Sequence, residues 1–275
     1  MEIRVAHSPD SDDAFMFYAL ASGKISTGNY HFIHVLEDIE SLNQKAVRGV
    51  YEVTAISIHA YAYVSDKYAL LPSGASMGDR YGPIVVSREP WDPADMPSKK
   101  IAVPGTMTSA YLALKLFQPN LDHVVISFDQ IMDAVQRGVV DGGLLIHEGQ
   151  LTYAQAGLKK IIDLGEWWHD TTGLPLPLGG NVIRRDLGMT HIRQVSRLIK
   201  ESIRFALDNR EDALQHAMQY ARDLNPGMAD RFVSMYVNQR TLDYGEEGRK
   251  AVRRMLQDAY DNKLIPSPVN VEFVE

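Results

Sequence analysis

Two stretches of the chain decide its fold: DIESLNQKAVRGVYEVTAISIH, residues 38–59, and FDQIMDAVQRGVVDGGLLIH, residues 128–147. Both contain Arg-Gly-Val, one further residue and then a carboxylate, which is Glu52 in the first stretch and Asp141 in the second. Each stretch starts with apolar residues at helical spacing, passes through the glycine and ends in an apolar run that predicts a strand. The repeated helix, turn and strand indicate two related halves that face each other across a cleft.

The rest of the chain fits the same class. Up to residue 184, short runs rich in Val and Ile alternate with stretches of helical period, which predicts an α/β protein with a largely parallel sheet. From His191 onward the pattern changes to three or four amphipathic helices, broken at Pro226 and near Gly245 and stopped by Pro266. We expect this helical segment to pack against the α/β part.

The lobes that a cleft requires can be assigned to parts of the chain. The segment GLPLPLGGN, residues 173–181, is expected to return the chain from the second lobe to the first. We therefore predict a discontinuous larger lobe, residues 1–90 and 180–275, and a smaller lobe, residues 91–179.

Composition excludes several classes of function. The 275 residues are 45% hydrophobic, which allows a sizeable core, and carry a formal charge of -7 from 35 acidic and 28 basic residues. No block of Lys and Arg predicts a nucleic-acid partner, so a small molecule is the expected ligand. The absence of cysteine excludes disulfides, thiolate metal sites and cysteine nucleophiles.

The N-terminal MEIRVAHSPD has a strand pattern and none of the features of an export signal. No run of about 18 apolar residues predicts a membrane-spanning helix. We expect a cytoplasmic protein without a membrane partner, and the residues indicate no oligomeric state.

Polar residues follow both strands of the repeat. Ser57 and His59 come at the end of the first strand, and His147 and Glu148 at the end of the second. Because ligands of open parallel sheets bind beyond the carboxyl ends of the strands, His147 is the strongest candidate for a reactive group. As neutral imidazole it would serve as a general base, with Glu148 orienting it or capping the next helix, and the alternative is a structural histidine.

Two helix starts are rich in side-chain oxygens. The segment PGTMTS offers Thr106, Thr108 and Ser109, which either cap a helix over residues 106–117 or add their groups to an anion site at its N-terminus. The segment SPDSDDAF offers Asp10, Asp12 and Asp13. With His7 these carboxylates could suggest a divalent ion, but nothing fixes a ligand geometry, so we predict capping and no metal.

Two catalytic motifs are incomplete. GASMG, residues 74–78, matches the nucleophile elbow of serine hydrolases at Ser76, but the elbow requires a following helix and a turn and strand are predicted here. A glycine-rich loop near a lobe connection is the better interpretation. His147-Glu148 lacks the second histidine of H-E-x-x-H, since Leu151 stands in its place, so zinc is not expected.

Six blocks together resemble the 1,4-dihydroxy-6-naphthoate synthase family of the futalosine route to menaquinone, and the match runs over almost the whole chain. The blocks are SPDSDDAFMFYAL, SIHAYAYV, YGPIVVS, PGTMTSAYLAL, LLIHEGQLTY and LPLPLGGNVI. The first and the fifth are long enough to be specific.

The resemblance implies the two-lobed fold of type 2 periplasmic solute-binding proteins, with a central cleft and a helical C-terminal segment. It implies a lyase that converts cyclic dehypoxanthinyl futalosine to 1,4-dihydroxy-6-naphthoate without a cofactor or metal. The family's proton acceptor falls on His147, in agreement with the choice made from strand ends.

The family's substrate contacts fall at the tip of the earlier strand and at a helix start, here Ala55, Ile56, Ser57, Ser109 and Ala110. A lysine is common where this chain has Ala55, and a threonine where it has Ser109, so any contact at Ala55 must come from the backbone. Two other activities remain as alternatives: a chorismate dehydratase of the same pathway, and a non-catalytic protein that binds a small carboxylate.

Overall fold

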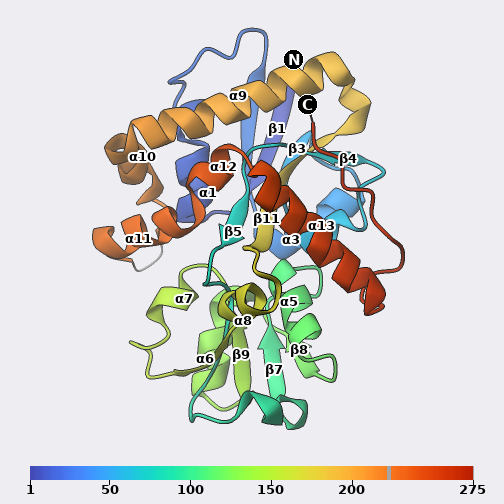
Figure 1. Cartoon of the computed structure of the whole chain (residues 1–275). Helices are drawn as coiled ribbons and strands as arrows, with labels where there is room; N and C mark the ends of the chain where they lie inside the picture. Colours follow the sequence, from blue (N-terminus) through green and yellow to red (C-terminus); the bar gives the residue numbers. More distant parts are fainter. Residues whose placement is uncertain (222–223, 275) are drawn as a thin grey trace.

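Two β-sheets with the same strand order form the framework of the computed structural model, which describes residues 1–221 and 224–274 (Figure 1). The first sheet has the order β2 (His31–Leu36), β1 (Glu2–His7), β3 (Val53–Ser57), β11 (Leu176–Arg184) and β4 (Tyr68–Leu70), and β5 (Ser76–Gly78) also pairs with β11. The second sheet has the order β8 (Asp122–Val125), β7 (Lys100–Val103), β9 (Gly142–Leu145), β6 (Ile84–Ser87) and β10 (Lys159–Asp163).

Both sheets are mixed rather than largely parallel. In the first sheet β1 is parallel to β2 and β3, whereas β11 runs antiparallel to β3. In the second sheet β7 is parallel to β8 and β9, whereas β6 runs antiparallel to β9. The prediction of a largely parallel sheet was wrong for β6 and β11, because each of them enters its sheet from the other lobe and not through a crossover helix.

The repeat seen in the sequence is confirmed in three dimensions. Helices α3 (Ile39–Val47) and α6 (Ile131–Gln136) each end in a glycine with positive φ, 68° at Gly49 and 71° at Gly138. In both turns the next N–H returns to the carbonyl five residues earlier, 3.3 Å from Val50 to Lys45 and 3.0 Å from Val139 to Ala134. Glycine reaches this left-handed conformation without the penalty of a Cβ.

The paired carboxylates of the repeat have one role. Glu52 accepts the backbone N–H of Arg4 in β1 at 3.1 Å, and Asp141 accepts that of Lys100 in β7 at 2.8 Å. Each carboxylate thus binds the backbone of the neighbouring parallel strand. The central strands β3 and β9 therefore occupy equivalent places, and their carboxyl ends both face the space between the sheets.

Helices of the C-terminal segment cover both sides of the first sheet. Helix α9 (Met189–Asp208) lies across the top of Figure 1 and buries Ile192, Val195 and Ile199 with residues of β1 and of helices α1 (Ser11–Met16) and α2 (Tyr18–Ala21). Helix α13 (Gly245–Asp261) packs on the other side, beside α4 (Ile58–Tyr61). The expectation that the segment packs on the α/β part is confirmed.

Three further helices complete the segment in the described residues: α10 (Arg210–Ala217), α11 (Pro226–Tyr236) and α12 (Gln239–Leu242). The break predicted at Pro226 is the start of α11, where proline occupies the first turn and Asn225 caps the helix. Proline suits this place because its missing N–H would have no partner there. Helix α13 ends at Asp261, before Pro266.

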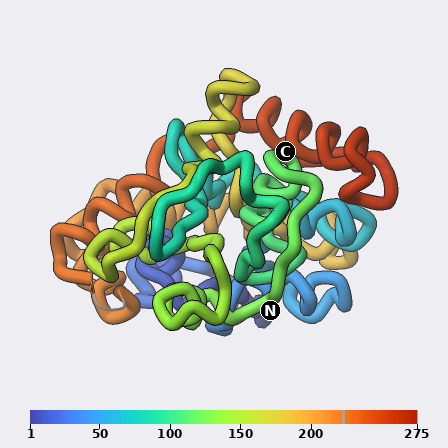
Figure 2. The backbone as a smooth tube through the Cα atoms, turned by 90° about the horizontal axis from the view of Figure 1, so that it is seen from below, coloured from blue at the N-terminus to red at the C-terminus, as the bar shows by residue number. Residues whose placement is uncertain are grey.

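The second lobe carries α5 (Ser109–Phe117), α6, α7 (Gly149–Thr152) and α8 (Leu164–Thr172), and seen from below it lies in front of the first (Figure 2). Three short 3-10 helices span Pro93–Ser98, Phe128–Gln130 and Arg185–Leu187. The chain passes from the first sheet to the second between β5 and β6 and returns between β10 and β11. The exact lobe limits at residues 90 and 180 stay a prediction. In residues 1–221 and 224–274 no helix is long and apolar enough to cross a membrane.

Candidate functional site

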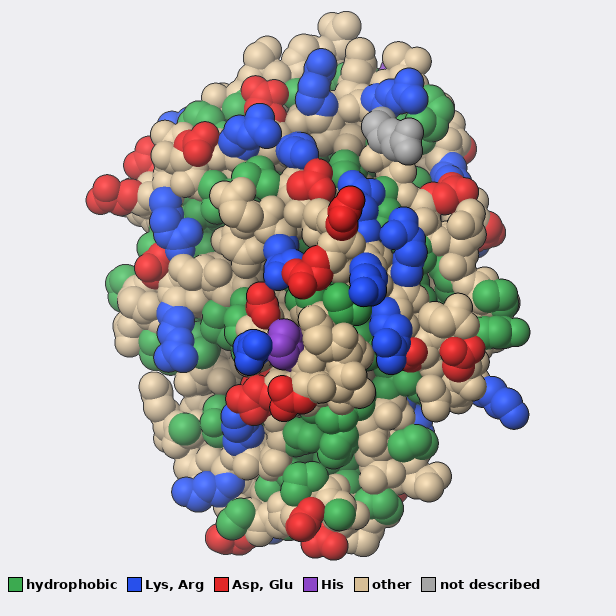
Figure 3. Space-filling view, in the orientation of Figure 1, with side chains coloured by type: hydrophobic (Ala, Val, Ile, Leu, Met, Phe, Trp, Pro, Cys, Tyr) green, Lys and Arg blue, Asp and Glu red, His purple; other side chains and the backbone are tan. Residues whose placement is uncertain are grey.

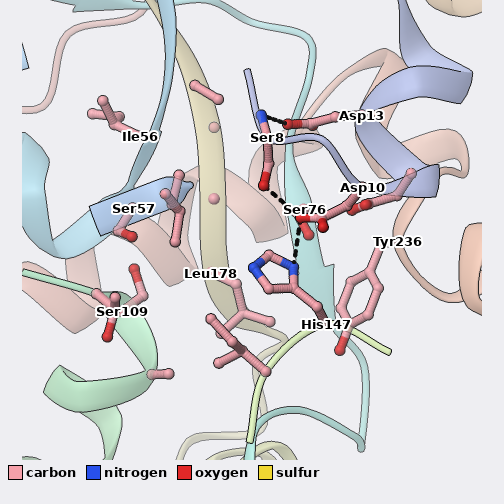
Figure 4. A pocket seen from close by; sticks show the side chains of 18 of the residues that line it. Ser8, Asp10, Asp13, Ile56, Ser57, Ser76, Ser109, His147, Leu178 and Tyr236 are labelled. Carbon is pink, nitrogen blue, oxygen red and sulfur yellow. Dashed lines mark hydrogen bonds and ion pairs between the residues drawn. The ribbon is translucent and has the colours of Figure 1, made fainter. Parts of the chain in front are cut away.

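A pocket between the two sheets receives side chains from both lobes (Figure 4). All six residues that the sequence analysis placed at the site line it: Ala55, Ile56, Ser57, Ser109, Ala110 and His147. The pocket also takes in Ser8, Asp10, Asp12 and Asp13 from the loop after β1 and the start of α1. Of the residues chosen from the strand ends, Ser57 and His147 line the pocket, whereas His59 and Glu148 do not.

His147 lies two residues after Leu145, the last residue of β9, in a strained turn. Its φ of 53° lies in the left-handed region, which costs a residue with a Cβ about 1–2 kcal/mol. Its Nδ1 lies 3.0 Å from Oδ2 of Asp10, which belongs to the first lobe. The Nε2 atom is buried and has no hydrogen-bond partner among the described residues. One ring nitrogen is thus held by the other lobe, and the second is left for a ligand.

Asp10 is itself fixed in place. The hydroxyl of Ser8 donates to Oδ2 of Asp10 at 2.5 Å, and the backbone N–H of Ser8 donates to Asp13 at 2.7 Å (Figure 4). On the second lobe, the ring of Phe128 meets the His147 imidazole edge to face, with centroids 5.1 Å apart. The imidazole is therefore oriented by contacts from both lobes.

The charge of His147 differs from the neutral form expected from the sequence. Burial lowers the pKa of His147, but the charge of Asp10 and the hydrogen bond to it outweigh burial and raise the pKa to about 9. Glu148 and Asp12 act in the same direction. The raised pKa favours the protonated imidazole at neutral pH, whereas the sequence predicted the neutral form because it does not show the distant partner Asp10.

The carboxylates after β1 do not cap their helix as predicted. Asp10 occupies the N-cap position of α1, yet its side chain accepts no N–H of the helix. Burial raises the pKa of Asp12 well above its ordinary value. Burial also raises the pKa of Asp13, to about 7, although the hydrogen bond from the Ser8 N–H opposes the shift. This corner of the pocket thus contains several carboxyl groups, but burial disfavours their charged forms.

The structure describes no metal centre at these residues. Within residues 1–221 and 224–274, no group of three or more His, Cys, Asp or Glu side chains is placed to hold an ion. His7, which the sequence grouped with these carboxylates, is buried against the ring of Phe17, and its Nε2 lies 3.1 Å from Nδ1 of His34.

Ser57 and Ser109 lie on the opposite side of the pocket from Asp10 and Asp13 (Figure 4). Asn43 holds Ser57, accepting its N–H at 2.8 Å and donating to its hydroxyl at 3.0 Å. The Ser109 hydroxyl accepts the N–H of His59 at 3.1 Å, which joins the two lobes. The hydroxyls of Ser57, at the end of β3, and Ser109, in the first turn of α5, thus form a neutral polar side of the pocket.

Helix α5 begins at Ser109 and not at residue 106. Thr108 is its N-cap and accepts the N–H of Tyr111 at 3.1 Å, so the capping interpretation holds for this threonine. Thr106 lies in the loop before the helix. An apolar part of the pocket lining comes from Ala55, Ile56 and Ala110, all of them buried.

Ser76 lies in β5, which leads toward β6 and not into a helix. The nucleophile elbow therefore does not form at GASMG, as the sequence analysis anticipated. Glu148 is buried at the N-cap position of α7, where its side chain accepts no N–H of the helix. Its effect at the site is the electrostatic one on His147.

Contacts close to the pocket hold the lobes together. The Tyr236 hydroxyl, on α11, lies 2.7 Å from the side-chain amide of Gln150, on α7. On the opposite side, the N–H of Met107 donates to Glu40 at 3.2 Å. The sequence analysis missed Tyr236 and Gln150 as well as the Asp10 pairing, since each contact joins segments far apart in the chain.

Two solved structures share this architecture over nearly the whole chain. A protein of Archaeoglobus fulgidus, AF1704, superposes with a TM-score of 0.92 at 49% identity and covers 96% of this chain and 98% of its own. A Candida albicans protein, described as exhibiting the generic periplasmic binding protein structural fold, superposes with a TM-score of 0.67 at 12% identity, covering 100% and 98%. The fold is therefore the periplasmic-binding-protein-like fold that the resemblance implied.

Two relatives match nearly end to end. A Thermus thermophilus protein named "1,4-dihydroxy-6-naphtoate synthase" is 40% identical over 97% of both chains. A Streptomyces coelicolor protein of the same name is 38% identical over 96% of this chain and 95% of its own. The model of a family described as "Menaquinone biosynthesis" matches residues 3–261. The resemblance drawn from the sequence blocks is confirmed, and the chain belongs to this menaquinone biosynthesis family.

Proposed function

We propose that this protein is a lyase of menaquinone biosynthesis that converts cyclic dehypoxanthinyl futalosine to 1,4-dihydroxy-6-naphthoate. The full-length similarity to two proteins of that name supports the activity. The observation that carries it at the site is the contact between His147 and Asp10, which places a strongly basic imidazole in a pocket shared by both lobes.

His147 is the proposed proton acceptor. Asp10 accepts a hydrogen bond from the Nδ1–H group, so the neutral tautomer presents the lone pair of Nε2 to the pocket. A base whose conjugate acid has a raised pKa is suited to a weakly acidic proton on carbon or on a hydroxyl. Only the neutral fraction of His147 can act, so the same carboxylate that strengthens the base also reduces the fraction present at neutral pH.

The other pocket residues are proposed to bind the substrate. Ser57, Ser109 and the free N–H groups at the start of α5 would hold its carboxylate, because helix geometry leaves these donors without partners in the helix. Ala55, Ile56 and Ala110 would pack against its ring. This places the aromatic end of the substrate away from the aspartates.

The proposed reaction needs no redox step. Removal of a proton from a hydroxyl of the sugar-derived part leaves an alkoxide, whose collapse to a carbonyl breaks a carbon–carbon bond. The sugar-derived fragment leaves as this carbonyl compound. The electron pair of the broken bond stays with the ring system, which takes the proton back from His147 and is released as the aromatic naphthoate. Closure of the lobes excludes water during this step. Aromatisation supplies the driving force, so neither a cofactor nor a metal is part of the proposal.

A small molecule is the proposed partner, with no nucleic acid and no membrane, and the cytoplasm is the proposed location. On the face in Figure 3, basic and acidic side chains are interspersed over the upper lobe and form no continuous basic stripe. A formal charge of -7 also disfavours polyanions.

The activity is tested by incubating the purified chain with cyclic dehypoxanthinyl futalosine and following 1,4-dihydroxy-6-naphthoate by its aromatic absorbance and mass. Chorismate serves as a second substrate. Turnover of the first compound and none of the second is expected. Dehydration of chorismate would identify a sister enzyme, and binding of the first compound without turnover would identify a non-catalytic binding protein.

A further inference from the structure

Asn181 has an unexplained side chain in the same pocket. It lies in β11, is 1% exposed, and lines the pocket. Both polar atoms of its carboxamide, Nδ2 and Oδ1, are buried without a hydrogen-bond partner among residues 1–221 and 224–274. Its backbone is fully engaged in the sheet, where its carbonyl accepts the Leu71 N–H at 2.9 Å.

Asn43 shows how this chain treats a buried amide that has a structural role. Asn43 is 0% exposed, and both ends of its carboxamide are bonded to Ser57, at 2.8 Å and 3.0 Å. Burial of an amide without partners lowers the stability of a fold, which makes such groups rare in native proteins. The buried amide of Asn181 therefore lowers the stability of the fold, and no contact within the described residues compensates for it.

The neighbourhood of Asn181 is shaped to hold the amide where it is. Gly74, which also lines the pocket, has a φ of 87°, and a Cβ added there would lie 2.0 Å from Nδ2 of Asn181. Any other residue at position 74 would displace the amide. The amide thus has a fixed position beside the pocket and does not depend on partners to keep it.

The surroundings indicate which ligand group the amide can take. Asp10, Asp12 and Asp13 line the same pocket, and the raised pKa values of Asp12 and Asp13 show that burial there disfavours further negative charge. A carboxylate only accepts hydrogen bonds and would leave Oδ1 of Asn181 without a partner, whereas a hydroxyl both donates and accepts and can satisfy either end of the amide.

We propose that Asn181 is a substrate-binding residue that takes a hydroxyl group of the sugar-derived, non-aromatic part of the substrate. The pairing of β11 with β3 sets Asn181 opposite Ala55. Its amide shares the pocket with Asp10 and His147. The inference rests on the proposed function and deepens it.

The test compares Asn181→Leu, which keeps the shape of the side chain and removes its polar atoms, with Asn181→Ala and with the native chain. We expect kcat/KM for cyclic dehypoxanthinyl futalosine to fall about tenfold in both variants, mainly through KM, as for a lost hydrogen bond to a bound ligand. The melting temperature of Asn181→Leu is expected to stay level or rise. Asn43→Leu is the matched control, and its melting temperature should fall.

Substrate analogues that each lack one hydroxyl of the sugar-derived part sharpen the test. The native protein should discriminate against one of them, and Asn181→Leu should lose that discrimination. If the native protein turns over the substrate while both variants keep its kcat/KM within twofold, the amide is satisfied by water alone and the inference is wrong. If the native protein neither binds nor turns over the substrate, the proposed function fails, and the inference fails with it.

Discussion

The pair formed by His147 and Asp10 combines a strained backbone with a buried charge. A positive φ of 53° at His147 turns the imidazole toward the other lobe, and Asp10 meets it at 3.0 Å. Strain of this kind persists where the surrounding structure fixes it and concentrates at functional sites. A residue held in a disfavoured backbone conformation is thus the one proposed to carry the chemistry.

The pH dependence of the reaction should report the pKa of His147. A general base acts when it is neutral, so kcat/KM of the native protein should rise with pH, with its midpoint near the raised pKa of about 9, and level off above it. In Asp10→Asn the burial of His147 is no longer opposed by the nearby charge, so the midpoint should move to lower pH. The plateau should fall about 10²-fold because the base is weaker and less well oriented.

The control for this pH profile is the same substitution in a chain that already carries His147→Gln. There Asp10→Asn should change the residual rate little, since its partner is gone. An unchanged midpoint in the single Asp10→Asn variant would contradict the role of Asp10.

The acidic corner of the pocket should make the fold less stable as the pH rises. Burial raises the pKa of Asp13 from 3.8 to about 7 in the folded state, so the folded chain binds this proton more tightly than the unfolded chain does. The contribution is therefore present below about pH 4 and is lost as the pH rises toward 7. Asp13→Asn keeps an acceptor for the Ser8 N–H without the charge, so it should exceed the native protein in stability at pH 8.

Urea unfolding at pH 5, 6, 7 and 8 measures this difference. The gain of Asp13→Asn over the native protein should shrink steadily toward pH 5, where the native carboxyl is protonated. A gain that is the same at every pH would show that Asp13 does not titrate in this range.

At the scale of single elements, the sequence predicted the local turns correctly, but it did not predict how distant strands pair. The turns at Gly49 and Gly138 follow from short-range chemistry, and the structure repeats their hydrogen bonds. The direction of β6 and β11 depends on strands that come from the other lobe, which no local pattern encodes. The start of α5 moved from residue 106 to 109 because Thr108, one of several candidate oxygens, makes the cap.

The turn after α3 should be sensitive to any residue other than glycine. Gly49 has a φ of 68° and no atom within 4 Å of an added Cβ, so the cost of Gly49→Ala is conformational and not steric. We expect a loss of about 1–2 kcal/mol in the free energy of unfolding, measured by urea titration. Gly49→Asn should lose less, since asparagine tolerates this conformation better. Equal stability of the alanine variant would contradict the turn.

At the scale of the whole molecule, the pocket exists only where two lobes meet. Its residues come from segments near positions 10, 57, 109, 147 and 181, and β3 and β9 bring their ends to one cleft. The repeat and the strand-end rule pointed to a cleft and to Ser57 and His147 in its lining, whereas Ala55, Ile56, Ser109 and Ala110 came from the family resemblance. Asp10, Tyr236 and Asn181 could not be chosen, because their roles depend on partners or on a lack of partners in the folded chain.

Contacts between the lobes should tune substrate affinity. Tyr236→Phe removes the hydroxyl that meets Gln150 at 2.7 Å across the cleft and should weaken the closed arrangement. A loss of about 1 kcal/mol would raise KM about fivefold with little change in kcat. Tyr260→Phe, at a half-exposed tyrosine on α13, is the matched control. An unchanged KM in Tyr236→Phe would show that this contact does not contribute to closure.

The most direct test of the central claim measures binding and turnover of cyclic dehypoxanthinyl futalosine by the native chain, His147→Ala and His123→Gln. His123 lies on β8 of the same lobe and outside the pocket, so His123→Gln should behave as the native protein does. His147→Ala should still bind the substrate but lose at least about 10²-fold in kcat, as expected for removal of a general base. Product formation by His147→Ala at the native rate would contradict the account.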